Sequence, residues 1–375
     1  MTEYKAEYKD KHKTKQVRIG DIIIGGGMPV AIQSMTNVDS RDEVALLRQI
    51  AELTDADCRI VRIAVPDMES AETLGRVKQK LLRTGNRVPL VADIHFDYRL
   101  AIAAIKAGAD KIRINPGNIG SLDRVKAVVE AAKEREIPIR VGVNSGSLEK
   151  DILEKYGGVT AEGLAESALA NLKIIQDMDY DNLVVSIKSS NVPMNYEAHK
   201  LLAAGTDCSV HIGITEAGTL ERGKVKSAVG IGALLLEGIG DTMRVSLTAD
   251  PVEEVIFAWE ILSSMGLKKS AVDLVSCPTC GRTKIDLQKL TLQVESRLSL
   301  IEERLTAEGS PSIKVAVMGC AVNGPGEARE ADFGVAGGDG RGIIFAKGEI
   351  LMTNVPEEEI ADRLIKVIEE KICGK

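Results

Sequence analysis

Three cysteines in the last third of the chain have the residue type and spacing for redox or metal chemistry. Cys277 and Cys280 are three positions apart in a Cys-Pro-Thr-Cys loop, and Cys320 follows an apolar run, 313–318, that predicts a strand. A Gly-Pro-Gly turn then leads to Glu327. Two thiolates at this spacing can bind one metal centre from a tight turn, and a neighbouring loop can supply further ligands. The cysteines predict an iron–sulfur cluster, a zinc site or a redox dithiol.

The fourth ligand helps to distinguish these sites, because a structural zinc site is closed by four Cys or His side chains. No histidine follows His211, so only Cys373 offers a fourth sulfur, and it lies near the end of the chain, where chains often fray. The three cysteines are left with an open position or an oxygen ligand, which suits a [4Fe–4S] cluster that binds substrate. A redox dithiol would leave Cys320 without a role. The iron–sulfur interpretation is favoured, with zinc and the dithiol as alternatives.

The chain before these cysteines alternates short apolar strands with amphipathic helices. The first helix follows Ser40-Arg41-Asp42-Glu43, the pattern of a capping box with Ser40 as its first residue. Eight βα units in roughly 240 residues predict a (β/α)8 TIM barrel. A doubly wound open sheet, the alternative, usually has fewer units, and no glycine fingerprint follows the first strand. The expected strands are 31–35, 59–65, 89–94, 110–114, 138–143, 182–187, 208–212 and 242–247.

The pattern changes after Gly266, where a second domain is expected to begin. The apolar residues from Leu287 to Leu305 are spaced three and four apart and predict a helix. Short apolar runs at 271–275, 313–318, 333–336 and 342–346 predict strands, and Pro356 opens a last helix. We therefore expect a TIM-barrel domain over residues 1–268, which also carries a short hairpin at 16–24, and a small α+β domain over residues 269–375.

Composition limits the class of protein. The chain of 375 residues is 44% apolar, has no apolar run long enough to span a membrane, and carries a net charge of −7, which argues against a general nucleic-acid surface. Its first residues are rich in lysine and lack the apolar core of a secretory signal, so we expect a solvated tail. Six cysteines without an export signal favour a reducing cytoplasm, with cysteines as ligands rather than disulfides.

The carboxyl ends of the barrel strands are where a TIM barrel places its active site. Five basic side chains lie in or at the end of otherwise apolar strands, where a charge is expensive to bury unless it is paired. Polar side chains and two histidines accompany them at the same ends. The candidate substrate-binding residues are Arg62, Asp93, His95, Arg113, Asn115, Arg140, Asn144, Lys188, His211, Arg244 and Ser246.

Two explanations account for these basic residues. Each could pair with its own carboxylate, but the same strand ends supply few acids, mainly Asp93 and Glu216. A shared, multiply charged anion, most simply phosphate or diphosphate, explains the whole set better. Glu216, in Thr-Glu-Ala-Gly, is the best candidate for a catalytic acid or base, and its alternative role is to cap the following helix.

Taken together, these motifs resemble the 4-hydroxy-3-methylbut-2-enyl diphosphate synthases of the methylerythritol phosphate route to isoprenoids. The similarity covers nearly the whole chain. It rests on Gln33-Ser34-Met35-Thr36, Val61-Arg62, Ala92-Asp93-Ile94-His95, the run from Arg113 to Asn118, the run from Gly213 to Gly218, the run from Cys277 to Arg282, and the run from Gly319 to Ala328.

The resemblance implies a reaction, a cofactor and partners. The reaction is the two-electron reductive opening of 2-C-methyl-D-erythritol 2,4-cyclodiphosphate, with loss of water, to (E)-4-hydroxy-3-methylbut-2-enyl diphosphate. The cofactor is a [4Fe–4S] cluster on Cys277, Cys280 and Cys320, with Glu327 as a displaceable fourth ligand. Ferredoxin or flavodoxin supplies the electrons, and the chain forms a head-to-tail homodimer of the bacterial two-domain type. Glu216 is implied as the group that handles the proton.

Two other functions remain as alternatives. A zinc-stabilised TIM-barrel aldolase or isomerase acting on a phosphorylated small molecule would use the cysteines only structurally. An iron–sulfur electron carrier would not explain the basic residues at the strand ends. The identity of the electron donor, and whether the cluster acts in its own subunit or in the partner, do not follow from the sequence.

Overall fold

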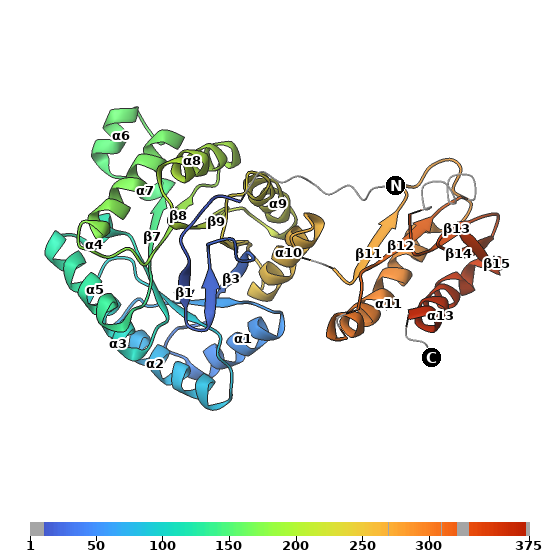
Figure 1. Ribbon diagram of the computed structural model, residues 1–375, viewed down its shortest axis with the longest axis horizontal. Coiled ribbons are helices and arrows are strands. Elements are labelled where there is room, and N and C mark those ends of the chain that lie inside the picture. Colours follow the sequence, from blue (N-terminus) through green and yellow to red (C-terminus); the bar gives the residue numbers. More distant parts are fainter. Residues whose placement is uncertain (1–10, 269, 309, 321–329, 373–375) are drawn as a thin grey trace. The chain divides into compact units, whose positions relative to one another are not determined.

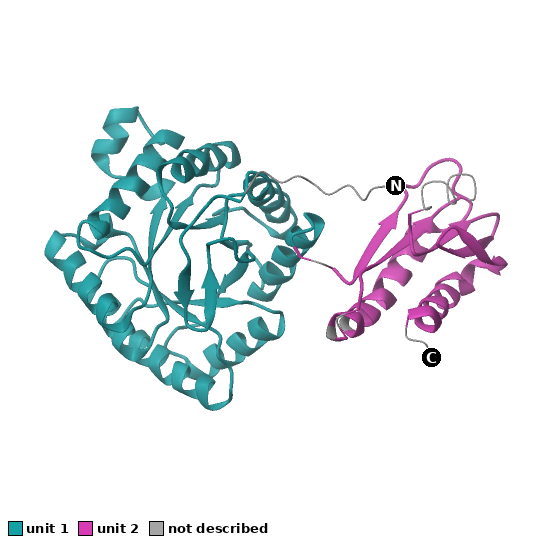
Figure 2. Cartoon of the chain, in the orientation of Figure 1, with its two compact units in different colours: residues 1–267 teal, residues 268–375 magenta. Residues whose placement is uncertain are grey.

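The chain forms two compact units, Met1–Leu267 and Lys268–Lys375 (Figure 2). The computed structural model describes residues 11–268, 270–308, 310–320 and 330–372. No helix within these residues is long and apolar enough to cross a membrane.

The first unit is a closed barrel of eight parallel strands, which confirms the predicted TIM barrel (Figure 1). The barrel closes because β10 pairs with β9 on one side and with β3 on the other. The last strand is shorter than expected and ends at Arg244. The strands are β3 (Ala31–Met35), β4 (Ile60–Ala64), β5 (Leu90–Asp93), β6 (Lys111–Ile114), β7 (Ile139–Asn144), β8 (Leu183–Lys188), β9 (Ser209–Gly213) and β10 (Thr242–Arg244).

Helices surround this barrel and bury their apolar faces against it (Figure 1). The expected capping box at Ser40 is wrong, because Asp42 caps the first helix and accepts hydrogen bonds from the N–H groups of Val44 and Ala45, both at 3.0 Å. The helices are α1 (Glu43–Asp55), α2 (Met68–Arg83), α3 (Tyr98–Ala107), α4 (Pro116–Ile119), α5 (Leu122–Arg135), α6 (Lys150–Tyr156), α7 (Ala161–Gln176), α8 (Val192–Gly205), α9 (Leu220–Leu236) and α10 (Pro251–Ser264).

A hairpin closes the amino-terminal end of the barrel. Its strands, β1 (Val17–Ile19) and β2 (Ile22–Ile24), are antiparallel. The buried side chains of Ile19 and Ile24 pack against the first residues of the barrel strands, including Ile60. The side chains of Ile19 and Ile24 thus exclude water from the amino-terminal end of the barrel interior.

The residues just before the hairpin are also held to the barrel, so the expected solvated tail is wrong for residues 11–16. Thr14 is buried, and its hydroxyl donates to the carboxylate of Asp241 at 3.0 Å. Lys15 pairs with Asp181 and Asp207. Lys5 and Lys9 lie outside the described residues.

In its described residues, the second unit is a five-stranded sheet with two helices on one face, the small α+β domain that was expected (Figure 1). Strands β11 (Val272–Ser276), β12 (Ile313–Met318) and β13 (Phe333–Gly337) are parallel, and β14 (Arg341–Ala346) and β15 (Glu349–Pro356) continue the sheet antiparallel. The helices are α11 (Leu287–Ala307) and α13 (Ile360–Ile372), the second preceded by a short 3-10 turn.

Candidate functional site

The predicted basic residues of the barrel strands face its interior. Successive side chains of a strand point to opposite faces, so every second residue lies inside a barrel. Strand pairing sets Arg113 beside both Asp93 and Arg140, and Lys188 beside Asn144. The side chains of Arg62, Arg113 and Arg140 are buried, and those of Lys188 and Arg244 are half-buried.

Asp93 connects the basic residues on one side of the barrel. Its carboxylate lies 3.3 Å from the Nη1 of Arg113, 3.8 Å from the Nε of Arg62 and 3.5 Å from the Nε2 of His95. Burial alone would raise the pKa of Asp93, but Arg62, the hydrogen bond from His95, and Arg113 lower that pKa well below its usual value. Asp93 therefore remains an anion that holds two arginines in place.

Arg244 has a carboxylate partner that the sequence analysis missed. Glu254, in the first turn of α10, is buried, and its Oε2 lies 3.4 Å from both the Nε and the Nη2 of Arg244. Pairing with a separate acid, the less favoured explanation, thus applies to Arg244. A signal was present, because Glu254 shares one helix face with Ala258 and Ile261, where an apolar residue is expected.

Arg140 is fully buried and, within the residues that the structure describes, has no carboxylate partner like that of Arg244. The same holds for Lys111, which, like Glu254, the sequence analysis missed. All three guanidinium nitrogens of Arg140 lack a hydrogen-bond partner among the described residues. The Nζ of Lys111 lies 3.4 Å from the Oε1 of Gln33. Burial and the neighbouring arginines lower the pKa values of Arg140, Lys111 and Lys188 well below their usual range. Lys111 was predictable, because it lies two residues before Arg113 on the same face of β6.

The described part of the interior therefore has more basic groups than acids. Six basic side chains, Arg62, Lys111, Arg113, Arg140, Lys188 and Arg244, face the two carboxylates of Asp93 and Glu254. Such a set is costly to bury unless an anion compensates it. The arrangement favours the binding of a multiply charged anion.

A glycine makes the position of Arg113 possible. A Cβ atom on Gly142 would lie 2.7 Å from the Nε of Arg113 and 3.0 Å from its Nη2. Real Cβ atoms do not approach other atoms so closely, so the absence of a side chain on β7 lets Arg113 reach Asp93. At position 142, β7 therefore contributes space to the site rather than a functional group.

The other predicted residues take different positions. The Nδ1 of His211 lies 2.7 Å from the hydroxyl of Thr242, and burial together with Arg140 and Lys188 lowers the pKa of His211 well below its usual value, so the ring is neutral. Asn115 is buried and caps α4, because its Oδ1 accepts the N–H of Gly117. Asn144 and Ser246 are half-buried beside the strand ends.

Glu216 lies in the loop after β9 and is exposed. Its alternative role as a helix cap is wrong, because the residue that precedes α9 is Thr219. Its backbone has a φ of 50°, a conformation that non-glycine residues rarely adopt and that often marks functional sites. The loop is fixed to the one after β10, where the N–H of Thr248 donates to the carbonyl of Gly218 at 3.1 Å.

The cysteines of the second unit follow the ends of two adjacent parallel strands. Ser276 and Val317 are register partners, so Cys277 and Cys320 lie at the same edge of the sheet. The N–H of Gly319 donates to the sulfur of Cys277 at 3.2 Å. Cys280 is exposed, and the N–H of Arg282 lowers the pKa of its thiol.

This sulfur-rich edge fits an iron–sulfur cluster better than a disulfide. The thiols of Cys277, Cys280 and Cys320 are all free, and a backbone N–H directed at a cysteine sulfur is a contact that tunes such clusters. In the described part of the chain, no three His, Cys, Asp or Glu side chains converge closely enough to hold a metal ion. Glu327 and Cys373 lie outside the described residues.

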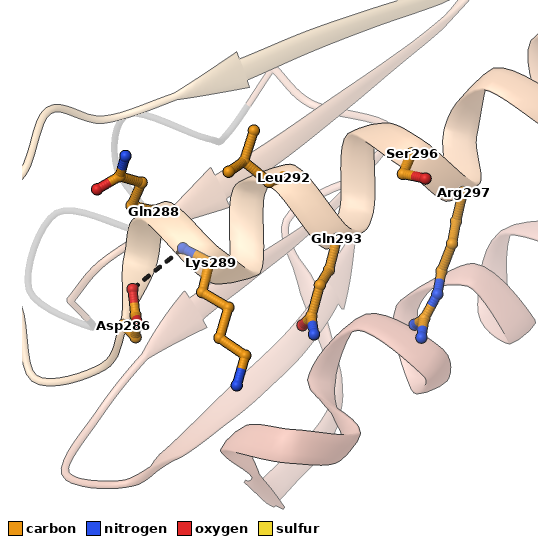
Figure 3. A pocket seen from close by; sticks show the side chains of 7 residues that line it. All are labelled: Asp286, Gln288, Lys289, Leu292, Gln293, Ser296 and Arg297. Atoms are coloured by element: carbon orange, nitrogen blue, oxygen red, sulfur yellow. Dashed lines mark hydrogen bonds between the residues drawn. The ribbon is translucent and has the colours of Figure 1, made fainter.

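A shallow pocket on the outer face of α11 includes none of the predicted site residues (Figure 3). Asp286 caps the helix there by accepting the N–H of Lys289 at 3.0 Å, and Arg297 pairs with Asp362 at 2.7 Å. These contacts give Asp286 and Arg297 structural roles. The lining residues are Asp286, Gln288, Lys289, Leu292, Gln293, Ser296 and Arg297.

Both units match models of one protein family. The GcpE TIM-barrel domain matches residues 14–259, and the GcpE protein C-terminal domain matches residues 273–370. The chain belongs to the GcpE family. This confirms the resemblance that the motifs indicated, and the family relationship makes the chain an enzyme of the oxidoreductase class.

Named relatives match nearly the whole chain. A protein of Clostridium acetobutylicum is 54% identical over 357 residues, which cover 95% of this chain and 98% of the relative. One of Caldanaerobacter subterraneus is 53% identical over 364 residues, covering 97% and 99%. Both are named 4-hydroxy-3-methylbut-2-en-1-yl diphosphate synthase (flavodoxin). These names do not support the alternative of a zinc-stabilised aldolase or isomerase.

Proposed function

We propose that the chain reduces 2-C-methyl-D-erythritol 2,4-cyclodiphosphate with two electrons and two protons, opens its ring and releases water, to give (E)-4-hydroxy-3-methylbut-2-enyl diphosphate. The observation that carries this function is the excess of buried basic groups over carboxylates in the barrel interior. A diphosphate supplies the negative charge that these groups lack, and the full-length relatives at 53% identity carry the name of this synthase.

In this proposal, the diphosphate is bound by Arg62, Arg113, Arg140, Lys188 and Arg244. Asp93 holds the first two arginines, and His95, at the exposed end of β5, hydrogen-bonds to Asp93. Asn115, Asn144, Ser246 and His211 complete the substrate-binding set. Glu216, exposed in the loop after β9, is the group that delivers or accepts the proton at the reacting oxygen.

We also propose that Cys277, Cys280 and Cys320 hold a [4Fe–4S] cluster, with Glu327 as the fourth ligand. The support is the common sheet edge of Cys277 and Cys320 and the N–H of Gly319 that points at a thiol. When bound, this cluster would supply the reducing electrons one at a time. The residues of the chain position the substrate, compensate its charge and move the proton.

Anaerobic purification followed by a turnover assay tests the function. We expect a brown protein with broad absorbance near ~400 nm, as iron–sulfur clusters on cysteine thiolates give. We also expect it to convert the cyclodiphosphate when reduced flavodoxin is present. A colourless protein that contains zinc and leaves the cyclodiphosphate intact would contradict the proposal.

The binding half is tested separately by Arg113→Ala. Loss of a buried, charge-assisted contact to the diphosphate should raise the KM for the cyclodiphosphate about 100-fold, the equivalent of roughly 3 kcal/mol. The absorbance of the cluster should not change, because Arg113 lies in the other unit. Wild-type KM in this variant would remove Arg113 from the site.

The proposal extends to the partners and location of the chain. Flavodoxin or ferredoxin is the electron donor, and two chains form a homodimer, so the particle in solution should have twice the mass of one chain. A cytoplasmic location agrees with the free thiols of the described cysteines, which reducing compartments preserve.

A further inference from the structure

Glu254 is a buried carboxylate that links three parts of the barrel mouth. Only 4% of the residue is exposed. Its Oε2 accepts from the hydroxyl of Ser34 at 3.2 Å and from Arg244, while its Oε1 accepts the N–H of Leu247 at 2.9 Å. One side chain of α10 thus contacts β3, β10 and the loop that follows β10. Helix packing alone would favour an apolar residue at this position.

These contacts control how Arg244 is presented. The carboxylate binds the Nε and Nη2 of Arg244, whereas the Nη1 lies 3.6 Å from the sulfur of Met35. A thioether is a weak acceptor, so Nη1 remains available for a phosphoryl oxygen. An arginine side chain loses rotamer freedom when it is fixed, and the contact with Glu254 removes much of that freedom before an anion arrives.

The same carboxylate fixes the loop that carries Ser246. It accepts the N–H of Leu247, the residue that immediately follows Ser246. The next residue, Thr248, donates its N–H to the carbonyl of Gly218 in the loop that carries Glu216. The loops after β9 and β10 are therefore joined to each other and held by one anchor on α10.

We propose that Glu254 is a positioning residue for the substrate anion, acting through Arg244 and the loop at Ser246. This inference rests on the proposed function, which makes Arg244 and Ser246 part of the diphosphate site. Without the charge of Glu254, Arg244 loses its fixed direction and the anion is bound less tightly, while the redox centre is unaffected.

Glu254→Gln and its neighbour Glu253→Gln form a matched pair of variants. Glu253→Gln removes the same charge from the same helical turn. Glu253, however, is half-exposed and pairs with Lys224 at 3.9 Å. In Glu254→Gln the KM for the cyclodiphosphate should rise about tenfold, as expected for a weakened hydrogen bond to a charged group, with little change in kcat. In Glu253→Gln the KM should stay at the wild-type value. Equal KM values in the two variants would overturn the proposal.

A double variant separates positioning from a general loss of stability. If Glu254 acts through Arg244, Glu254→Gln should add little to the KM of Arg244→Ala, so that the two effects are far from multiplicative. Multiplicative effects would show that Glu254 acts independently of Arg244 and would overturn the proposal. If Glu254→Gln does not fold, Glu254→Asp keeps the charge but shortens the reach, and it should raise the KM in the same non-multiplicative way.

Binding of inorganic diphosphate, measured by calorimetry, distinguishes this proposal from the proposed function. Weaker binding in Glu254→Gln than in Glu253→Gln supports the positioning role even if the wild-type enzyme does not convert the cyclodiphosphate, a result that would contradict the proposed function alone. Equal binding in the two variants overturns the positioning role even if the wild-type enzyme is active.

Discussion

The barrel interior and the cysteine edge of the second unit organise their functional groups in opposite ways. In the barrel, Arg62 and Arg113 are buried and held by Asp93 before any substrate is present. At the cysteine edge, Cys280 is exposed, and the three thiols do not converge as ligands of one ion. In the barrel, the protein itself organises the basic groups, whereas at the cysteine edge the proposed cluster would complete the geometry when it binds, as happens at many metal sites.

The largest effect that tests this comparison is expected from Cys280→Ser. Removing one thiolate should prevent cluster assembly, so the absorbance near ~400 nm and the turnover should both be lost. Binding of inorganic diphosphate, which depends on the other unit, should remain at the wild-type level. Unchanged iron content in Cys280→Ser would show that this residue is not a ligand.

A smaller effect should come from Gly142→Ala, which disturbs the binding half without removing a functional group. The new methyl group would overlap the guanidinium of Arg113 and push it away from Asp93. We expect the KM for the cyclodiphosphate to rise about tenfold, the size of one weakened charge-assisted contact, with the cluster absorbance unchanged.

Gly232→Ala on α9 is the matched control for that variant. Its Cβ atom would meet only the sulfur of Met265, at an ordinary 3.9 Å. It should therefore keep the wild-type KM, and as a glycine-to-alanine change within a helix it should not lower the melting temperature. A wild-type KM in Gly142→Ala as well would indicate that the position of Arg113 does not limit binding.

The smallest effect concerns stability toward acid, which should differ between the two units. His199 is fully buried on α8, and burial lowers its pKa from 6.5 to about 4. Between these values the unfolded chain binds a proton that the folded chain does not, so the stability of the barrel falls as the pH falls through this window.

His199→Gln should make this fall shallower by about 1 kcal/mol between pH 6.5 and pH 5.5. The fluorescence of the single tryptophan, Trp259 on α10, reports the unfolding of the barrel unit alone. The second unit contains no histidine, so its own unfolding should be the same in both proteins. An identical slope for the barrel in both proteins would show that His199 is not a source of acid sensitivity.

The sequence predicted the barrel well because its signal is local and repeated. Each strand is a short apolar run, and β3 has the predicted bounds. Elements with weaker patterns were missed. β15 was not expected because most of its residues are exposed, and α4 and α6 are short helices in the loops after β6 and β7.

The site was predicted in its composition but not in its pairing. The types of Arg62, Arg113 and Arg140 predicted an anion site, since charges in apolar strands need an explanation. Glu254 was missed because it reaches Arg244 from a helix, and a contact across the barrel wall has no fixed spacing in the sequence. The space left by Gly142 for Arg113 also depends on strand register, which the sequence alone does not give.

The hairpin of β1 and β2 closes one end of the barrel and leaves the other end as the route to its interior. Because Ile19 and Ile24 fill the amino-terminal end, a molecule that reaches Arg140 must enter and leave at the carboxyl ends of the strands. In the proposed reaction, the product keeps the diphosphate and must depart by the route through which the next substrate arrives. Each product molecule must then leave before the next substrate can enter. Accumulated product should therefore compete directly with substrate for the same entrance.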